Sequence, residues 1–504
     1  MAAAADWPQW GGRDERNMAS AERGLPEWFE PGTKKSDGSG VDPATTRNVK
    51  WVARLGGQAC SSPAVSGGKV FIGTNASAQD DAKHPAASGG VLKCFDEASG
   101  KLLWNFAVPH VESSGKRLAF DDMDLGICSS PTVEGDRVYL VTNRCEAVCL
   151  DTAGGLKWRF DMLSQLPVYP HDAANCSVLV HGDLLYVCTS NGVTRGHERT
   201  VPCPLAPSLI ALDKHTGRLV AKDDEKIGPR LFHGQWSSPS LARTAGREAI
   251  LFGGGDGVCY AFAPAADHGR MVPGTMYPWS VEGCAALSKL WSYDCNPPQY
   301  KLQDGKPIKY WNGDTRLHLG NANDGRYVGP SEIIATPVFH ENRVYLAVGQ
   351  DPRHGRGRGI LHCIDATRTG DISQTGTIWS YDKLDRTLST VSVAGGLVYV
   401  ADIAGAVHCL DAETGHCYWV HQTGAEIWGS TLVADGKLYL GTKKSFWVLA
   451  AGKQLKVLHE IRLGTSVWST PVAANGVLFV ASQRYLWAVQ SQESVARAGH
   501  DKQE

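Results

Sequence analysis

The sequence predicts an all-β protein folded as an eight-bladed β-propeller, with four antiparallel strands in each blade. One unit, most complete over residues 396–421, recurs along most of the chain, and its best-spaced copies place Trp379 and Trp419 forty residues apart. The apolar runs are short and are separated by turns rich in glycine and proline. Short strands in a large repeat architecture have this pattern.

Each unit opens with an inner strand that carries a Ser-Ser-Pro-like sequence. Three looser openings, which contain Cys176, Ser389 and Gly429, bring the total to eight. The five clear openings begin at Ser61, Ser129, Ser237, Thr336 and Thr470.

The third strand of a unit ends in aspartate, and a glycine follows a few residues later. An aspartate side chain can accept hydrogen bonds from the next backbone N–H groups, and glycine tolerates positive φ, so the pair predicts a tight turn. A fourth, outer strand marked by tryptophan comes next. The aspartates are Asp96, Asp151, Asp213, Asp365 and Asp411, and the tryptophans are Trp104, Trp158, Trp291, Trp379 and Trp419.

The ends of the chain are predicted to close the ring. The last unit stops after its third strand, whereas residues 48–55 form a lone outer strand around Trp51 with no inner strands before it. Pairing the two would complete the last blade and remove a free sheet edge. We therefore expect an N-terminal surface arm over residues 1–47, a propeller over 48–490 and a polar C-terminal tail over 491–504.

Composition limits the classes of partner. Fifty basic and fifty-two acidic residues, with a pI near 6.8, create no large field for nucleic acid. No apolar run approaches the roughly 18 residues of a membrane-spanning helix. The opening Met-Ala-Ala-Ala-Ala lacks the parts of an intact signal peptide. We expect a mature periplasmic or extracellular protein whose signal peptide has been removed.

Most long insertions are predicted to emerge on one face of the propeller. They occupy the loop between the second and third strands of a blade or the connection to the next blade, at residues 75–90, 109–126, 190–207, 222–234, 296–331 and 350–359. Residues 264–288 are the main exception. Loops built up on one face indicate a binding site at the mouth of the channel, so a small-molecule ligand is expected there.

Polar residues just before the inner strands are the candidate site. Imidazole and carboxylate groups together can hold a divalent cation or act as a general base. Arginine could clamp a carboxylate or phosphate. The predicted metal ligands are His171, His233, Glu332, Glu426 and Asp124, and the predicted catalytic residues are His171, Asp172 and Arg386. The alternative is a solvated funnel with salt bridges between blades.

Three tryptophans and a glutamine are candidates for binding a cofactor. Trp236, Trp428 and Trp468 occupy equivalent inner-strand positions, and Gln235 precedes the first of them. Flat rings around a channel could stack on a quinone or a sugar. The alternative is that they fill the bore as packing residues, as repeated aromatic residues commonly do in propellers.

Most of the fourteen cysteines fall where other units carry alanine or glycine, which predicts small buried hydrophobic residues. Cys203, Cys284 and Cys295 lie in insertions and are the better disulfide candidates. Cys60 and Cys128 share the inner-strand position of the three tryptophans, so they could be functional thiols near the channel. The acidic run 121–124 lacks the ligand spacing of a calcium loop.

The Asp-x-x-x-Gly-x-x-x-Trp units, as at Asp96–Trp104 and Asp411–Trp419, resemble the repeat of pyrroloquinoline-quinone-like propellers over roughly residues 48–490. The opening Asp-Trp-Pro-Gln-Trp-Gly-Gly and the stretch from Phe232 to Pro239 are similar to exported propellers of planctomycetes. The superfamily of pyrroloquinoline-quinone-like propellers includes quinoprotein alcohol and sugar dehydrogenases and also a non-catalytic outer-membrane assembly lipoprotein.

The resemblance implies an exported oxidoreductase that acts on a sugar or small alcohol. It implies a divalent metal ion, either calcium or a transition metal. Quinoprotein dehydrogenases usually carry adjacent, disulfide-bonded cysteines above the quinone, and this sequence has no Cys-Cys pair. The family resemblance therefore allows pyrroloquinoline quinone as a cofactor, but the sequence contains no marker that supports it. Without Cys-x-x-Cys-His, a covalent c-type haem is excluded. The alternative implied by the family is a non-catalytic scaffold that binds protein partners through its rim loops.

Overall fold

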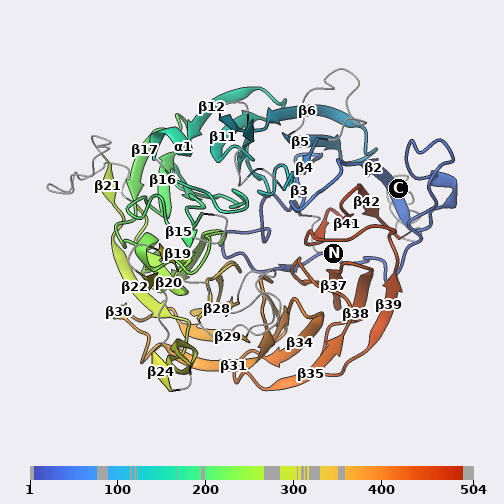
Figure 1. The fold of residues 1–504 in the computed structure, drawn as a ribbon. Coiled ribbons are helices and arrows are strands. Elements are labelled where there is room, and N and C mark those ends of the chain that lie inside the picture. Colours follow the sequence, from blue (N-terminus) through green and yellow to red (C-terminus); the bar gives the residue numbers. More distant parts are fainter. Residues whose placement is uncertain are drawn as a thin grey trace.

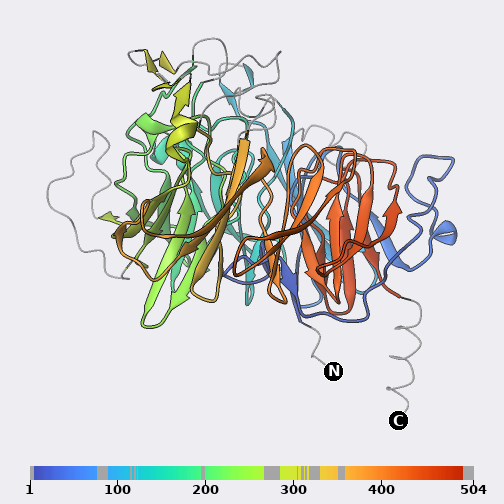
Figure 2. The same ribbon diagram turned by 90° about the horizontal axis from the view of Figure 1, so that it is seen from below.

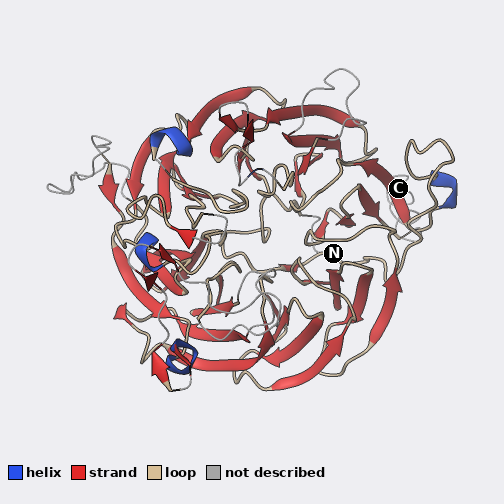
Figure 3. Ribbon diagram, in the orientation of Figure 1, coloured by secondary structure: helices blue, strands red, loops and turns tan. Residues whose placement is uncertain are grey.

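The computed structural model describes residues 5–76, 89–113, 116–117, 121, 123–166, 168–194, 199–265, 284–303, 305–307, 311–312, 315–316, 330–349 and 358–491. Within these ranges, the structure has eight sheets of four or five strands. Figures 1 and 3 show that the sheets are arranged in a ring. The predicted eight-bladed propeller is confirmed.

The strands of each blade follow one another from the channel outward. Blade 1 holds β3 (Ala64–Ser66), β4 (Lys69–Asn75), β5 (Gly89–Asp96) and β6 (Leu102–Pro109). Blade 2 holds β9 (Thr132–Glu134), β10 (Arg137–Val141), β11 (Glu146–Asp151) and β12 (Leu156–Asp161). Blade 3 holds β13 (Leu179–His181), β14 (Leu184–Cys188), β16 (Leu209–Asp213) and β17 (Leu219–Lys222), and blade 4 holds β18 (Ser240–Thr244), β19 (Arg247–Gly253), β20 (Val258–Phe262) and β22 (Lys289–Asp294).

The second half of the ring repeats this plan. Blade 5 holds β27 (Val338–His340), β28 (Arg343–Val348), β29 (Arg358–Asp365) and β31 (Thr377–Asp385), and blade 6 holds β32 (Ser392–Ala394), β33 (Leu397–Ala401), β34 (Ala406–Asp411) and β35 (Cys417–Gln422). Blade 7 holds β36 (Leu432–Ala434), β37 (Lys437–Gly441), β38 (Phe446–Ala450) and β39 (Val457–Ile461). Blade 8 holds β40 (Val472–Ala474), β41 (Val477–Ala481), β42 (Tyr485–Val489) and β2 (Val49–Arg54).

Strand β2 closes the ring. It pairs antiparallel with β42, with Trp51 opposite Ala488 and Ala53 opposite Leu486. The N-terminal strand thus supplies the outer edge of blade 8, as its lone tryptophan predicts. Because the two ends of the chain share one sheet, blades 1 and 8 do not separate without breaking this ladder.

Tryptophans of the outer strands bind blades 8, 1, 2, 5 and 6 each to the following blade. The indole of Trp379 donates to Ala412 O at 3.1 Å, and that of Trp419 donates to Gly452 O at 2.9 Å. The ring of Trp379 also covers Gly415, where a Cβ atom would lie 2.6 Å from the ring. This glycine is therefore required by the packed ring as well as by its φ of 72°.

The Ser-Ser-Pro motif builds a ring of hydrogen bonds between blades. In seven pairs of neighbouring blades, a backbone N–H at the start of one inner strand donates to the hydroxyl at the equivalent position of the next, at 2.8–3.1 Å. Blade 8 joins blade 1 in the same way, through Thr470 N and Ser62 Oγ. The hydroxyls belong to Ser62, Ser130, Ser177, Ser238, Thr390, Ser430 and Thr470.

The strand order places the insertions as predicted. In an antiparallel blade the loop after the second strand and the connection after the fourth leave by the same edge, and six of the seven insertions occupy those positions. Figure 2 shows the two faces from the side. Two insertions pair above blades 3 to 5, because β15 (Arg199–Thr200) joins β26 (Thr315–Arg316), which in turn joins β25 (Trp311–Asn312).

Shorter elements complete the described chain. They are the helices η1 (Pro43–Thr45), α1 (Met162–Gln165), η3 (Gly228–Arg230) and η4 (Pro298–Lys301), and the strands β1 (Ala19–Ser20), β7 (Glu112–Ser113), β8 (Lys116–Arg117), β21 (Ala285–Ala286), β23 (Leu302–Gln303), β24 (Lys306–Pro307) and β30 (Gly370–Asp371). None of the helices in these ranges is long and apolar enough to cross a membrane.

The N-terminal arm crosses the end of the channel opposite the insertions (Figures 1 and 2). Residues 7–20 bond in turn to backbone atoms of all eight blades, and Trp7 and Met18 are buried. The blade partners are Val65, Val133, Val178, Leu241, Phe339, Val393, Val433 and Ala473. The arm, expected on the surface, therefore also closes one end of the channel.

Arg16 is fully buried at the centre of this arm. Its guanidinium donates to Val178 O at 2.7 Å, Pro239 O at 3.1 Å, Trp10 O at 2.6 Å and Gln9 Oε1 at 3.0 Å. Burial lowers the pKa of Arg16 to about 10, so the side chain remains a cation at neutral pH. A buried cation needs such a set of acceptors, which fixes the arm against blades 3 and 4.

Replacing Trp51 by Ala should open the ring. Trp51 is buried, donates to Glu97 O at 2.9 Å and covers Gly100 in blade 1, so its loss should cost about 3–5 kcal/mol. We expect a lower thermal midpoint and faster tryptic cleavage between blades 8 and 1. Trp28→Ala is the matched control, because Trp28 is 38% exposed. A Trp51→Ala protein that melts like the control would show that β2 does not close the ring.

Candidate functional site

A cavity of about 1050 Å³ occupies the channel. One residue from each blade, two positions before the hydroxyl ring, forms its wall. These residues are Cys60, Cys128, Asn175, Trp236, Ile334, Leu388, Trp428 and Trp468. Trp10 of the N-terminal arm also lines the cavity, and its indole donates to Thr336 Oγ1 at 3.0 Å. The cavity is thus a pocket with its floor at the arm and its mouth among the insertions.

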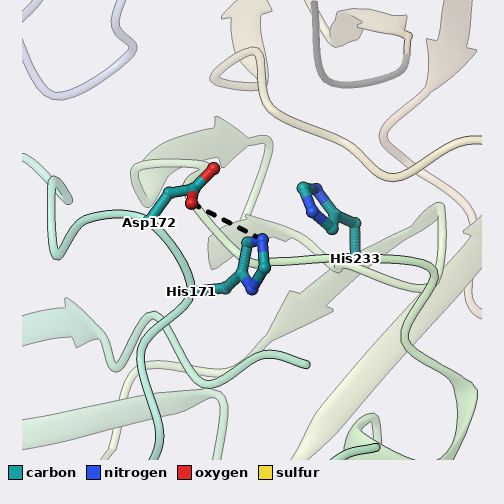
Figure 4. Close-up of side chains that lie close together, drawn as sticks. All are labelled: His171, Asp172 and His233. Carbon is teal, nitrogen blue, oxygen red and sulfur yellow. Dashed lines mark ion pairs between the residues drawn. The ribbon is translucent and has the colours of Figure 1, made fainter. Parts of the chain in front are cut away.

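Three predicted site residues meet at one side of this mouth (Figure 4). His171 and Asp172 precede blade 3, and His233 precedes blade 4, so neighbouring connections supply them. One ligand atom from each lies within 4.8 Å of the other two. His171 Nε2 is 3.7 Å from Asp172 Oδ1, and the two imidazole centroids are 4.0 Å apart. The histidine side chains are 4% and 3% exposed, whereas Asp172 is 17% exposed and lines the cavity.

Val193 of the blade 3 insertion holds both histidines. His171 Nδ1 lies 2.6 Å from Val193 O, and Val193 N donates to His233 O at 3.1 Å. Because a carbonyl only accepts, His171 Nδ1 must carry the proton, which in the neutral ring leaves the Nε2 lone pair directed toward Asp172. Gly192 permits this approach, since a Cβ there would lie 2.7 Å from His171 Cβ.

Backbone conformation and Trp236 fix the loop that carries Asp172. The indole of Trp236 donates to His171 O at 3.1 Å and to Ala173 O at 3.2 Å, on either side of Asp172. Asp172 itself has φ of 59°, a conformation that is costly for most residues and is common at functional sites. Trp236 therefore supports the histidine loop, and its ring lies 5.4 Å from that of His233.

Glu332 extends this group. It comes from the next connection, before blade 5, is fully buried, and has its Oε1 atom 3.7 Å from His233 Nδ1. The structure thus brings together His171, Asp172, His233 and Glu332, which arrive from three successive connections.

The other predicted metal ligands lie elsewhere around the mouth. Glu426 precedes blade 7, which lies across an eight-membered ring from blade 3, and its Oε2 contacts Trp428 Nε1 at 3.1 Å and Lys443 Nζ at 3.3 Å. These hydrogen bonds lower the pKa of Glu426. Asp124 precedes blade 2 and lies 3.2 Å from His110 Nε2. Glu426 and Asp124 therefore do not join the predicted metal ligands at His171 and His233, because blades 7 and 2 hold them beside other partners.

Arg386 and Gln235 have different surroundings. Arg386 lines the cavity before blade 6, beside Asp385, with its side chain 9% exposed. Gln235 is buried behind the wall, where its amide donates to Asn191 O at 3.0 Å and to Ser208 Oγ at 2.9 Å. Gln235 is therefore not placed to contact a ligand in the cavity.

Trp428 and Trp468 form an aromatic platform on the wall opposite the histidines. Their rings stack with centroids 5.3 Å apart and planes inclined by 25°. Because they precede blades 7 and 8, they lie four blades from His171 and His233. The cavity thus has one wall with imidazole and carboxylate groups and one with indole rings.

Sequence reasoning missed a second polar cluster. His110 Nδ1 is 2.6 Å from Asp121 Oδ2, and His110 Nε2 is 3.2 Å from Asp124 Oδ1, with His110 and Asp121 both buried. The acidic run 121–124 was a visible signal. No sequence pattern marked His110 as the partner of this run, because its contact with Asp121 depends on how the chain between them, which includes β7 and β8, folds back.

All fourteen cysteines lie in the described ranges and are free thiols. The expected disulfide candidates Cys203, Cys284 and Cys295 do not pair. Cys203 lies in the blade 3 insertion, Cys284 precedes the outer strand β21, and Cys295 is buried after β22, so different parts of the propeller hold them apart.

The fold is an eight-bladed propeller whose long insertions lie mostly on the face where the cavity opens. Comparison with known proteins places this chain in a family. Residues 88–266 and 357–496 match the family model described as outer membrane protein assembly factor BamB, of the PQQ-like repeat type. This is more than half of the chain, so the protein belongs to that family. A search of curated protein sequences found no significant match.

Two solved structures share the fold. BamB from Moraxella catarrhalis has 15% identity and a TM-score of 0.54, with 87% of this chain and 99% of that chain covered. A europium-containing methanol dehydrogenase has 13% identity and a TM-score of 0.59, with 95% of this chain and 89% of that chain covered. At these identities the similarity establishes the architecture alone.

Asp223 supports the loop that carries His233. It is buried and accepts hydrogen bonds from Ser208 N at 2.6 Å, Leu209 N at 2.8 Å and Glu225 N at 3.2 Å, while Ser208 Oγ accepts from Gln235. Burial raises the pKa of Asp223 from 3.8 to about 6. The folded protein therefore binds this proton more tightly than the unfolded chain does.

The stability that the Asp223 proton contributes should be fully present below about pH 4 and lost as the pH rises through 6. Relative to Asp223→Asn, the wild-type protein should lose on the order of 3 kcal/mol between pH 4 and pH 7.5. Thermal midpoints of both proteins across this range measure the difference. Asp382→Asn, at an exposed carboxylate, is the control. A constant difference between wild type and Asp223→Asn would contradict the raised pKa.

Proposed function

We propose that this protein is an exported, metal-dependent oxidoreductase that acts on a sugar or small alcohol at the insertion-rich mouth of the channel. The convergence of His171, Asp172 and His233 beside a cavity of about 1050 Å³ carries the proposal. The reaction class rests on family membership and on the fold shared with the methanol dehydrogenase. Export rests on the family description, which names an outer membrane assembly factor.

The residues fit a transition metal. Bonds of about 2.0–2.2 Å to imidazole nitrogen and carboxylate oxygen put donors roughly 3–3.5 Å apart, so the three ligand atoms need to close by about 1 Å. Two imidazoles with a carboxylate suit iron, zinc or a similar ion, whereas calcium prefers six to eight oxygen ligands. The bond from His171 to Val193 O provides the outer support that metal-binding histidines normally have.

The described residues give no comparable support for a quinone. The stacked rings of Trp428 and Trp468 contact each other and leave no slot between them for a planar cofactor. The proposed reaction therefore contains no quinone.

In the proposed reaction an alcohol becomes a carbonyl, so its hydroxyl loses a proton and its carbon loses a hydride to an external electron acceptor, whose place the dye takes in the assay below. Each wall of the cavity has a distinct role in this reaction. When bound, the metal would polarise a hydroxyl oxygen of the substrate. Asp172 lines the cavity and is the residue placed to accept the hydroxyl proton. Trp428 presents an aromatic face on which a sugar ring can stack, and Arg386 can orient a polar or anionic substituent.

A protein-interaction scaffold is the second candidate function. It is favoured by the family description as an assembly factor and by coverage of 99% of the BamB chain. In that case the rim insertions would bind a protein partner and the polar mouth would be a solvated funnel. Full partner binding by a His171→Ala/His233→Ala protein would favour the scaffold.

Removing either histidine should abolish metal retention. The protein is equilibrated with Zn²⁺ or Co²⁺ and dialysed, after which bound metal and the visible Co²⁺ spectrum are measured. His171→Ala and His233→Ala should each weaken retention by about 100-fold or more, since each removes one of few ligands. His340→Ala is the matched control, because its ring is 37% exposed and lies far from the mouth. Equal retention by all four proteins would exclude the site.

The reaction itself is tested by dye reduction. Metal-loaded protein is mixed with sugars or short alcohols and a reducible dye as electron acceptor. Asp172→Asn should lower kcat by at least about 100-fold even when excess metal keeps the site loaded, because the amide retains an oxygen for the metal but cannot accept the proton. Turnover that is undiminished in Asp172→Asn would refute the role of that carboxylate. Absence of turnover in metal-loaded wild type would refute the oxidoreductase assignment.

A further inference from the structure

Cys60 and Cys128 occupy the same position in blades 1 and 2, and both line the cavity. Each lies two residues before a hydroxyl of the interblade ring. Ser62 N donates to Ser130 Oγ at 2.9 Å, and Ser61 Oγ donates to Ser129 O at 3.1 Å. The two segments are therefore held side by side directly after the cysteines.

The two thiols are neighbours in this wall. The side chain of Cys60 lies within hydrogen-bonding reach of Cys128, and both cysteines are half-buried. The Cys128 thiol is also 3.9 Å from Leu125 O and from Gly126 O, so the loop before blade 2 fixes its position.

This pair differs from the other close cysteines. Cys188 N donates to Cys176 Sγ at 3.2 Å, but both residues are fully buried, where an oxidant cannot reach them. Cys60 and Cys128 instead border a cavity that opens among the insertions. Contact with Cys60 and burial both raise the pKa of Cys128, so the pair consists of thiols until an oxidant or a base acts on it.

We propose that Cys60 and Cys128 form a disulfide that covalently joins blades 1 and 2 in the channel wall. One thiol loses its proton and attacks a low-molecular-weight disulfide such as oxidised glutathione, which releases one glutathione thiolate and leaves a mixed disulfide. The second cysteine then displaces the other glutathione. The protein loses two hydrogen atoms, and the glutathione disulfide is reduced to two thiols. This inference rests on the proposed function only for export, because an oxidising compartment supplies the disulfide.

The bond would constrain the side of the pocket that also holds Gln58 and Met123. It would close a loop that contains the whole of blade 1, so the unfolded chain would lose conformational freedom. Oxidation should therefore raise the thermal midpoint, and a reductant should reverse the change.

The full chain is reduced, freed of reductant and treated with oxidised glutathione, and its intact mass, free-thiol number and linked peptides are measured. Wild type should lose the mass of two hydrogen atoms and yield one peptide pair that joins Cys60 to Cys128. Cys60→Ser and Cys128→Ser should instead each gain one glutathionyl group on the remaining cysteine. Cys203→Ser, which removes a half-buried cysteine elsewhere, should behave like wild type.

Stable glutathionylation of both cysteines in wild type would overturn the proposal, as would an unchanged mass or a linked pair that lacks either residue. Because this measurement needs neither metal nor substrate, its failure is distinct from failure of the proposed oxidoreductase activity.

Discussion

The hydrogen bonds between neighbouring inner strands are the interaction on which the rest of the molecule depends. Each backbone N–H that meets the hydroxyl of the next blade fixes the radial and angular position of both strands at the channel. The tryptophans do the same at the periphery, where an indole such as that of Trp379 bonds to the following blade and covers its turn glycine. Two concentric sets of contacts, at the channel and at the periphery, thus set the width of the channel independently of the residues at the candidate site.

This framework separates residues that must be alike from residues that are free to differ. The hydroxyl position recurs in every blade, and the turn aspartate recurs in five of them. Two positions before the hydroxyl, the side chain points into the cavity, and the blades carry cysteine, asparagine, tryptophan, isoleucine or leucine there. Chemical asymmetry is therefore confined to the channel wall and the connections above it, where it does not disturb packing between blades.

The N-terminal arm makes the channel into a pocket. Its backbone and the side chains of Arg16 and Ser20 together bind all eight blades, and the buried guanidinium of Arg16 is held by oxygen acceptors from the arm, Val178 and Pro239. With one end closed by Trp10, a ligand in the cavity must enter among the insertions. The N-terminal segment therefore has two structural roles: β2 closes the ring, and the arm before it covers one end of the channel.

The sequence by itself determined the architecture, because the hydroxyl, aspartate, glycine and tryptophan positions act locally or on the next blade and so recur with the repeat. It also identified the developed face and the histidines. Only the tertiary structure decided that His171, Asp172, His233 and Glu332 meet while Glu426 and Asp124 lie apart, that Gln235 lies behind the wall, and that His110 joins the acidic run. The physical reason is that contact across a wide channel depends on angular separation between blades and on insertion backbone such as Val193, neither of which follows from a repeating pattern.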